Sequence, residues 1–208
     1  MAAVLATLAV GLAWRMAAEA PGVVSPAAAA ALSPELLRGL QDGRDTPQAG
    51  NPMGAVTIVE FFDYRCPYCR IMQPRLEALA AKDKRVRILF KDWPIFGGVS
   101  VSAARVALAA QFQGKYLAVQ KALFALPRTM DEAALRDAVA GAGVDMARLD
   151  RDLAVRSAVI DAELARTDGE ARAIGFQGTP GLVLGAMAMP GALTDVELQK
   201  LVNQAAAQ

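Results

Sequence analysis

The residues best suited to chemistry in this 208-residue sequence are its two cysteines, Cys66 and Cys69. Pro67, which follows Cys66, is favoured at the first position of a helix. A cysteine at a helix start faces free backbone N–H groups and the positive end of the helix dipole, and both lower the pKa of a thiol. We therefore expect Cys66 to be the nucleophilic thiolate.

Cys69 lies three residues further on, on the same face of the expected helix. This spacing allows the two sulfur atoms to close into a disulfide and to reopen. The indicated chemistry is thiol–disulfide exchange, in which Cys66 forms a mixed disulfide and Cys69 resolves it. Three alternatives stay open: half of a zinc site, which needs further ligands, an inert local disulfide, which stabilises little because its loop is short, and two buried free thiols.

Composition excludes several other kinds of chemistry. The sequence contains no histidine, so Ser–His and Cys–His catalysis and imidazole-based zinc sites are ruled out. The 22 basic and 21 acidic side chains give a formal net charge of +1 without a long charged run, which argues against a nucleic-acid partner. We expect no metal and no cofactor apart from the redox-active Cys66–Cys69 disulfide.

The elements that must position the cysteines lie on either side of them. Val56–Phe62 is β-branched, aromatic and almost wholly apolar, which predicts a strand buried on both faces. The helix after Cys66 carries Met72, Leu76 and Leu79 on one face, and a second strand is expected at Val86–Lys91. The opening unit is therefore strand, cysteine pair at a helix start, strand.

The chain beyond the second strand has helical periodicity throughout its middle. The Thr129–Glu132 segment forms a capping box that predicts a helix start, and Asp145 is expected to cap the following helix. A strand pattern returns at Gly178–Leu184, and a last helix is expected over Thr194–Asn203. These spacings indicate an all-helical subdomain that covers a sheet.

Residues 1–20 are interpreted as a signal peptide or an N-terminal anchor. Met1–Trp14 is nearly all apolar, too short to span a bilayer but typical of the hydrophobic region of a signal peptide. Ala18–Ala20 has the form of a cleavage site. We therefore expect export to the periplasm or cell envelope.

Residues 21–50 are rich in Ala, Pro and Gly, which predicts a linker with one short helix at Pro34–Leu40. In that helix Leu36, Leu37 and Leu40 form an apolar stripe that could serve docking or self-association. The alternative for the whole segment is disorder. The folded domain is expected over residues 51–208.

Three motifs carry a resemblance to a known family. They are the string Val59–Cys69 with Pro74 five residues past the second cysteine, the segment Phe90–Gly97, and Gly178-Thr-Pro180. From Asn51 to the C-terminus the sequence resembles the DsbA-like thiol:disulfide oxidoreductases of bacterial cell envelopes. The resemblance implies an α/β thioredoxin fold with an all-helical insertion at about residues 98–175, between the second strand and the cis-proline strand.

The same resemblance assigns the substrate side of the site. Pro180 should be a cis-proline that faces the cysteines, and the backbone of Thr179 should pair with an extended substrate segment. Pro67 and Tyr68, between the cysteines, should also contact the substrate.

Glu60 matches the family's buried acid behind the active-site helix, which could relay the proton that leaves Cys69. A carboxyl group in so apolar a strand must be paired or neutral. Lys91, at the end of the second strand, is a candidate partner, and simple solvation of the strand end is the alternative for it.

The function expected from these residues is an exported dithiol–disulfide oxidoreductase that acts on unfolded or partly folded protein thiols and introduces disulfides. A membrane redox partner would regenerate the cysteine pair. One alternative is a disulfide isomerase or reductase, which would favour a homo-oligomer built by residues 21–50. Another is a non-enzymatic thiol- or copper-binding protein that uses Met187 and Met189 as soft ligands, although such methionines more often pack against apolar substrates.

Overall fold

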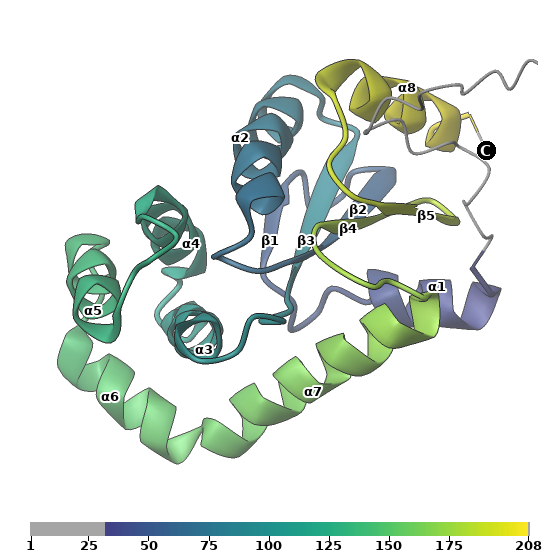
Figure 1. Ribbon diagram of the computed structural model, residues 1–208. Coiled ribbons are helices and arrows are strands. Elements are labelled where there is room, and N and C mark those ends of the chain that lie inside the picture. Colours follow the sequence, from purple (N-terminus) through teal and green to yellow (C-terminus); the bar gives the residue numbers. More distant parts are fainter. Residues whose placement is uncertain (1–31, 208) are drawn as a thin grey trace, which may run out of the picture.

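The computed structural model describes residues 32–207, which form a five-stranded sheet and eight helices (Figure 1). The signal peptide and cleavage site predicted at residues 1–20 lie outside the described residues. In chain order the elements are α1 (Pro34–Gln41), β1 (Gln48–Gly50), β2 (Val56–Phe62), α2 (Pro67–Lys82), β3 (Val86–Asp92), α3 (Val99–Gln111), α4 (Tyr116–Ala125), α5 (Glu132–Gly141), α6 (Met146–Val155), α7 (Ser157–Ile174), β4 (Gly181–Leu184), β5 (Met187–Pro190) and α8 (Asp195–Ala205).

The sheet has the strand order β1-β3-β2-β4-β5. Strands β2 and β3 are parallel, with Glu60 opposite Phe90 and Phe62 opposite Asp92, while the other three pairings are antiparallel. Every residue of β2 is buried, as its continuous apolar pattern predicted. This central strand ends at Phe62, four residues before Cys66, so the cysteine pair lies just beyond the carboxyl end of the central strand.

Helices cover both faces of the sheet (Figure 1). On one face, α2 and α8 pack with Ile58 and Phe62 into the larger core cluster. On the other, α1 and the end of α7 pack with Val59 and Phe61 into a second cluster. Because strand residues alternate between faces, each cluster takes alternate residues of β2.

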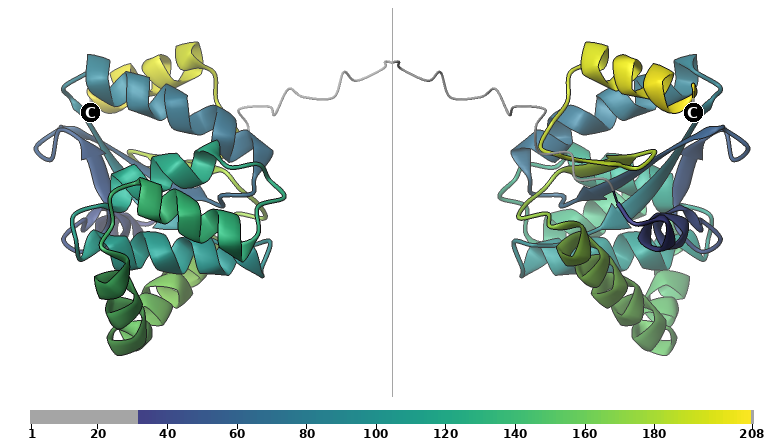
Figure 2. Two further views of the ribbon diagram at one scale, coloured as in Figure 1. Left: turned by 90° about the vertical axis from the view of Figure 1, so that its left-hand side faces the viewer. Right: turned by 90° about the vertical axis from the view of Figure 1, so that its right-hand side faces the viewer.

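The chain between β3 and β4 is helical, as predicted, and stands beside the sheet before α7 returns beneath it (Figures 1 and 2). One predicted start is wrong: α5 is capped by Asp131, whose carboxylate accepts a 2.8 Å hydrogen bond from the backbone of Ala134, and not by Thr129. The Asp145 cap of α6 is confirmed. The misplaced cap arose because Asp131 is as good a capping residue as Thr129.

The segment predicted as a linker contributes to the fold from Pro34 onward. Strand β1 pairs with β3 at the sheet edge, and Leu40 of α1 is fully buried in the second cluster. Leu36 and Leu37 also pack against that cluster, so the apolar stripe predicted for docking or self-association covers the protein's own sheet.

None of the helices in residues 32–207 is long and apolar enough to cross a membrane.

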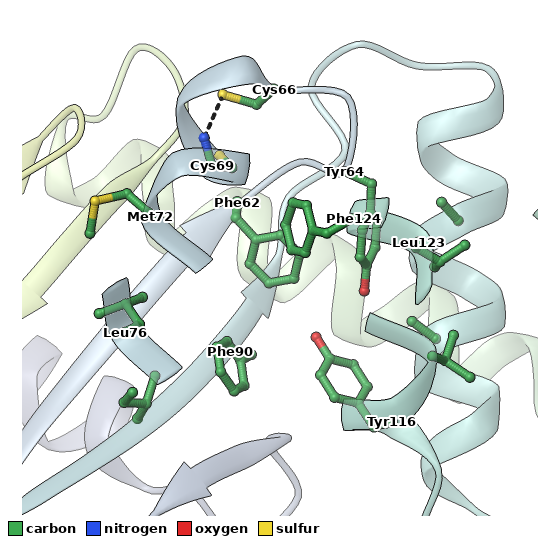
Figure 3. Close-up of a cluster of buried hydrophobic side chains, with 14 of the residues drawn as sticks. Phe62, Tyr64, Cys66, Cys69, Met72, Leu76, Phe90, Tyr116, Leu123 and Phe124 are labelled. Atoms are coloured by element: carbon green, nitrogen blue, oxygen red, sulfur yellow. Dashed lines mark hydrogen bonds between the residues drawn. The ribbon is translucent and has the colours of Figure 1, made fainter. Parts of the chain in front are cut away.

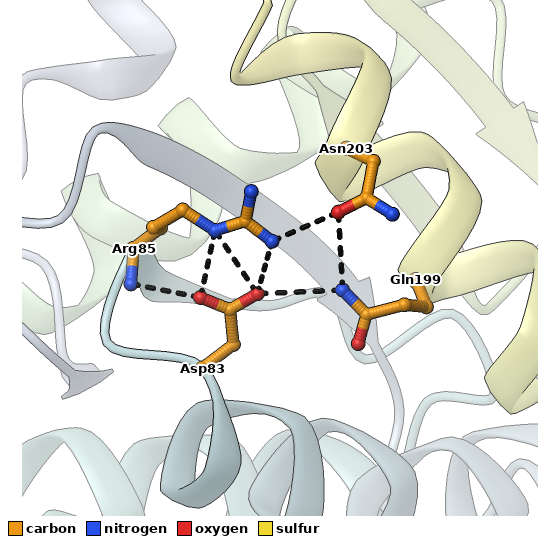
Figure 4. A network of polar contacts seen from close by, with 4 residues as sticks. All are labelled: Asp83, Arg85, Gln199 and Asn203. Carbon is orange, nitrogen blue, oxygen red and sulfur yellow. Dashed lines mark hydrogen bonds and ion pairs between the residues drawn. The ribbon is translucent and has the colours of Figure 1, made fainter.

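A polar network fixes the far end of α2 against α8 (Figure 4). Asp83, just after α2, accepts hydrogen bonds from Arg85 and from Gln199, and Arg85 donates a 2.8 Å bond to Asn203 on α8. The capping box predicted for Thr194 and Glu197 opens α8.

Candidate active site

Helix α2 begins at Pro67, with Cys66 as its N-cap residue. Cys66 is 2% exposed and Cys69 is fully buried one turn deeper. The backbone N–H of Cys69 donates to Cys66 Sγ over 3.4 Å, which is the interaction drawn in Figure 3. Both cysteines are free thiols in this structure. The sequence therefore located the helix start correctly.

Asp63 holds the loop that precedes Cys66. Its Oδ1 accepts hydrogen bonds from the backbone of Arg65 (2.7 Å) and the hydroxyl of Ser100 (2.9 Å). Its Oδ2 accepts from the backbone of Phe96 over 3.1 Å. One buried carboxylate thus joins the cysteine loop, the loop after β3 and the start of α3.

Arg70 and a pair of arginines join the cysteine helix to the helical insertion. The Arg70 guanidinium donates to the backbone carbonyls of Phe124 and Leu126 at the end of α4 and to that of Tyr64. Arg65 and Arg128 donate to one another's backbone carbonyls at 3.1 and 3.0 Å. These carbonyls lie at a helix end or in loops, where no helical N–H satisfies them.

The Thr179–Pro180 loop lies against Cys66, more than 110 residues away in sequence. The Cys66 thiol donates a 3.2 Å hydrogen bond to the Thr179 carbonyl, and the Thr179–Pro180 peptide bond is cis, as the resemblance implied. The structure therefore brings together the residues predicted for the two sides of the site. Their catalytic and substrate-binding roles stay predictions.

The environments of the two thiols push their pKa values in opposite directions. The hydrogen bond from the Cys69 side chain, helped by the Thr179 side chain and by the backbone N–H groups of Cys69 and Tyr68, lowers the pKa of Cys66 to about 6 against the opposing effect of burial. Burial, followed by the hydrogen bond to Cys66 and the nearby Glu60 charge, raises the pKa of Cys69 well above its ordinary value. At neutral pH, Cys66 is the thiolate and Cys69 keeps its proton.

Glu60 lies in the core with no exposed surface, and neither of its carboxyl oxygens has a hydrogen-bond partner among residues 32–207. Burial, then the charges of Cys66 and Asp92, raise the pKa of Glu60 to about 8. Of the two options predicted for this carboxyl group, paired or neutral, the structure favours the neutral form at pH 7.

Lys91 is not the partner of Glu60, so that prediction is corrected. Its fully buried ammonium group pairs with Glu170 of α7, with Nζ and Oε2 3.0 Å apart. In the parallel register Lys91 lies opposite Phe61, whose side chain points away from the face that carries Glu60. The one-residue difference in register places the two charges on opposite faces of the sheet.

Exposed apolar side chains surround the cysteines. Tyr68 is 60% exposed, and Ile71 of α2 and Phe96 of the loop after β3 are also exposed, while Pro67 is partly buried.

Met187 and Met189 of the edge strand β5 are partly buried against the larger core cluster. Within the described residues, no group of three or more His, Cys, Asp or Glu side chains is arranged to hold a metal ion.

Several residues of the site were not predicted from the sequence. Asp63 and Arg70 make bonds to distant backbone groups, so nothing in their local sequence pattern identified their partners. Asp92 and Tyr116, which share a buried hydrogen bond of 2.6 Å, were also missed. An acid at the end of a buried strand was the available signal for Asp92, because such a group must find a partner or a proton.

Comparison with known proteins gives consistent matches. The family model described as "DSBA-like thioredoxin domain" matches residues 57–202. Among solved structures, a thioredoxin-like oxidoreductase from Silicibacter pomeroyi DSS-3 is 37% identical, with a TM-score of 0.77 over 81% of this chain and 96% of that chain. The catalytic domain of Proteus mirabilis ScsC is 26% identical, with a TM-score of 0.74 over 84% of this chain and 98% of that chain.

Two further matches extend the comparison. The thiol-disulfide exchange protein alpha-DsbA2 from Wolbachia pipientis is 26% identical, with a TM-score of 0.77 over 82% of this chain and 91% of that chain. A curated relative named Na(+)/H(+) antiporter NhaA 1, from Mycolicibacterium gilvum, is 24% identical over 151 residues, which are 71% of this chain and 24% of that protein. The chain thus spans about a quarter of the length of the curated relative that it matches.

Proposed function

Because the chain belongs to the DSBA-like thioredoxin domain family, we propose that it exchanges disulfides with protein thiols through Cys66 and Cys69, with disulfide donation as the main direction. The fold expected from the resemblance, a thioredoxin fold with a helical insertion, is confirmed. The observation that carries the proposal is the position of Cys66: an N-cap thiol with a lowered pKa, in contact with the Thr179 carbonyl.

The first step of donation opens the protein's own disulfide. A substrate thiolate attacks Sγ of Cys66, forms a mixed disulfide with it, and displaces the Cys69 sulfur as a thiolate. Because Cys69 is buried and has a raised pKa, its thiolate takes up a proton at once. Glu60, protonated at neutral pH, is the proposed donor of that proton.

The second step releases the product. Another thiolate of the substrate attacks the substrate sulfur of the mixed disulfide, so the substrate gains a disulfide and Cys66 leaves as a thiolate. Two substrate thiols are oxidised and the Cys66–Cys69 disulfide is reduced. The low pKa of Cys66 makes it a good leaving group, which favours this direction.

The substrate is proposed to lie along Thr179 and Pro180 and over Pro67 and Tyr68. The backbone of Thr179 precedes β4 and could pair with an extended peptide. Tyr68 offers an exposed aromatic surface next to Cys66. An extended and partly apolar chain, as in an unfolded protein, fits these groups.

Export to the periplasm or cell envelope is proposed from the N-terminal sequence and from the similar proteins. One of these is a solved periplasmic thioredoxin-like protein from Salmonella enterica serovar Typhimurium, 26% identical over 85% of this chain. In that compartment the reduced cysteine pair would be reoxidised by a membrane partner that carries a disulfide. That partner accepts the two electrons that the substrate gave up.

The function is tested with the oxidised protein and a reduced, unstructured peptide that contains two cysteines. We expect one peptide disulfide to form for each Cys66–Cys69 pair reduced, as followed by mass spectrometry. Cys66→Ala is the matched control and should transfer none. Unchanged peptide after prolonged incubation with the oxidised wild type would remove the proposed activity.

The direction of exchange is expected to appear as a pH-dependent difference in stability between the two redox forms. The lowered pKa of Cys66 gives the reduced form stability that is fully present above the unfolded pKa of about 9 and is lost as pH falls through about 6. Between pH 4 and pH 7 the reduced form should gain about 1.4 kcal/mol relative to the oxidised form, because pH 7 lies about one unit above the folded pKa of Cys66.

Denaturant unfolding of both forms at pH 4 and pH 7 measures this difference. Glu60 has a raised pKa, so its contribution to stability is present below its unfolded pKa and is lost as pH rises. Glu60 is present in both redox forms, so its effect largely cancels in the comparison. A reduced form that gains nothing toward pH 7 would favour the alternative, a reductase or isomerase.

A further inference from the structure

A second buried acid lies behind the cysteine pair, in a cluster of three polar side chains. Asp92 at the end of β3 is 3% exposed, and its Oδ2 accepts a 2.6 Å hydrogen bond from the Tyr116 hydroxyl of α4. Tyr64, two residues before Cys66, directs its hydroxyl toward that of Tyr116 (Figure 3). Neither the Tyr64 hydroxyl nor Asp92 Oδ1 makes a hydrogen bond within the described part of the chain.

The sheet register places Asp92 on the face that carries Glu60. Glu60 lies opposite Phe90, and Asp92 lies opposite Phe62, two positions further along both strands. Paired residues of parallel strands point to the same side, and so do residues two apart. The two carboxyl groups are therefore diagonal neighbours in one apolar layer.

Within the described part of the chain, no cation forms an ion pair with either of these two acids. None of the ion pairs formed by residues 32–207 includes Asp92 or Glu60. The groups that face Asp92 are Glu60 from β2, Tyr64 from the cysteine loop, Tyr116 from α4 and the charge of Glu163 from α7. Lys91, its neighbour on β3, lies on the other face and pairs with Glu170.

We propose that Asp92 is a positioning residue for the exchange reaction, which acts by repelling charge on Glu60 and so keeps that carboxyl group protonated behind Cys69. The inference rests on the proposed role of Glu60 in the cysteine chemistry. The Tyr116 hydroxyl stabilises the ionised form of Asp92, so Asp92 is the carboxyl group that loses its proton first. A charge already present on Asp92 makes a second one on Glu60 costly in the same apolar layer.

The directions of the pKa values agree with this order. Burial raises the pKa of Asp92 to about 7, with the hydrogen bond of Tyr116 and the nearby Tyr64 hydroxyl acting against the rise and the charge of Glu163 adding to it. Glu60, for which Asp92 is one of the raising charges, reaches about 8. As pH rises through neutrality, Asp92 therefore loses its proton before Glu60, the acid that interacts with the cysteines.

The step that reports on Glu60 can be isolated with a small aromatic disulfide whose thiolate product absorbs visible light. The Cys66 thiolate attacks the reagent, releases one aryl thiolate and leaves a mixed disulfide. Cys69 then gives its proton to the Glu60 carboxylate, attacks Cys66 Sγ and releases the second aryl thiolate. The first phase depends on reagent concentration, and the second phase is intramolecular.

In the wild type the first phase should rise with pH around 6 and the second around 8, following Cys66 and Glu60. Asp92→Asn removes the repelling charge, so the midpoint of the second phase should fall by about one pH unit, with an increase of about fivefold in its rate at pH 7. The first phase should keep its midpoint. Tyr116→Phe, which leaves Asp92 less able to ionise, should shift the second phase in the same direction.

Three controls make the test decisive. Glu60→Gln should abolish the rise of the second phase near pH 8, and adding Asp92→Asn to it should change nothing more. Asp168→Asn is a control at an acid on α7 that accepts a hydrogen bond from the Trp93 side chain and does not face Glu60. This variant should leave both phases as in the wild type. Denaturant unfolding of each variant separates loss of folding from a shift in the pH profile.

The proposal is overturned if Asp92→Asn and Tyr116→Phe both fold and leave the midpoint of the second phase where the wild type has it. A shift of both phases together would also overturn it, because a general change in structure moves Cys66 as well. The small reagent needs no protein substrate, so these outcomes differ from a failure of peptide oxidation, which would count against the proposed function instead.

Discussion

Replacing Cys69 with alanine is expected to convert turnover into a stalled covalent complex. Cys66 keeps its position at the helix start, so it can still attack or be attacked. Without Cys69 no second sulfur is available to displace the partner, and the mixed disulfide persists. Added to a mixture of oxidised peptides or proteins, reduced Cys69→Ala should accumulate as adducts that resist removal of free thiol and release their partners with a strong reductant.

Cys66→Ala is the comparison for this experiment. Cys69 is fully buried and has a raised pKa, so it should form no adducts in the time that Cys69→Ala needs to be consumed. Oxidative turnover should be lost in both variants, by several orders of magnitude for a reaction that needs both sulfur atoms. Adducts on Cys66→Ala would show that the roles of the two thiols are reversed.

Removing the Asp63 carboxylate should cause a large loss of stability. Asp63→Ala leaves two backbone N–H groups and the Ser100 hydroxyl without their acceptor in a nearly closed environment. Hydrogen bonds to a charged group contribute about 1.5–3 kcal/mol each, and part of the loss is recovered by water, so we expect the free energy of unfolding to fall by about 3 kcal/mol. Urea unfolding of the oxidised protein, in which Cys66 does not titrate, measures this fall.

Asp63→Asn separates the two sides of this contact. The amide oxygen can replace Oδ1, which accepts from Arg65 and Ser100, while the amide nitrogen would face the Phe96 N–H in place of Oδ2. The loss should then be about 1 kcal/mol, for the Phe96 bond alone. Equal losses for both variants would show that Asp63 acts through its charge and not through these three bonds.

Sequence reasoning placed the two cysteines at a helix start correctly because the signals are local. Cys66, Pro67 and Cys69 lie within four residues, and a helix start determines the environment of all three. The buried strand β2 was also evident from its own residues. A prediction of this kind needs only the backbone pattern of one short segment.

Pairings across the sheet and between subdomains were not predictable in this way. Lys91 and Glu60 looked like partners because both are charged and lie in neighbouring strands, yet the register places them on opposite faces. A strand that is apolar at every position gives no alternation from which its faces could be read. The contact between Asp92 and Tyr116 was missed for a related reason, since it joins a strand to a helix beyond a loop.

Strand β1 was not predicted, because the Ala, Pro and Gly residues of the N-terminal segment suggested a linker. The strand is only three residues long and is held by its pairing with β3. So short an edge strand has no periodicity of its own. The packing of Leu40 against the second core cluster was visible only once the sheet was assembled.

The way in which Arg70 joins the cysteine helix to the insertion has an evolutionary consequence. Its guanidinium binds carbonyl oxygens of the main chain at Phe124, Leu126 and Tyr64, and every amino acid supplies that acceptor. Selection on this contact therefore falls on one partner only. A substitution at Leu126 keeps this acceptor and needs no compensating change at Arg70, so the insertion can vary in side chains there while its bond to the cysteine helix remains.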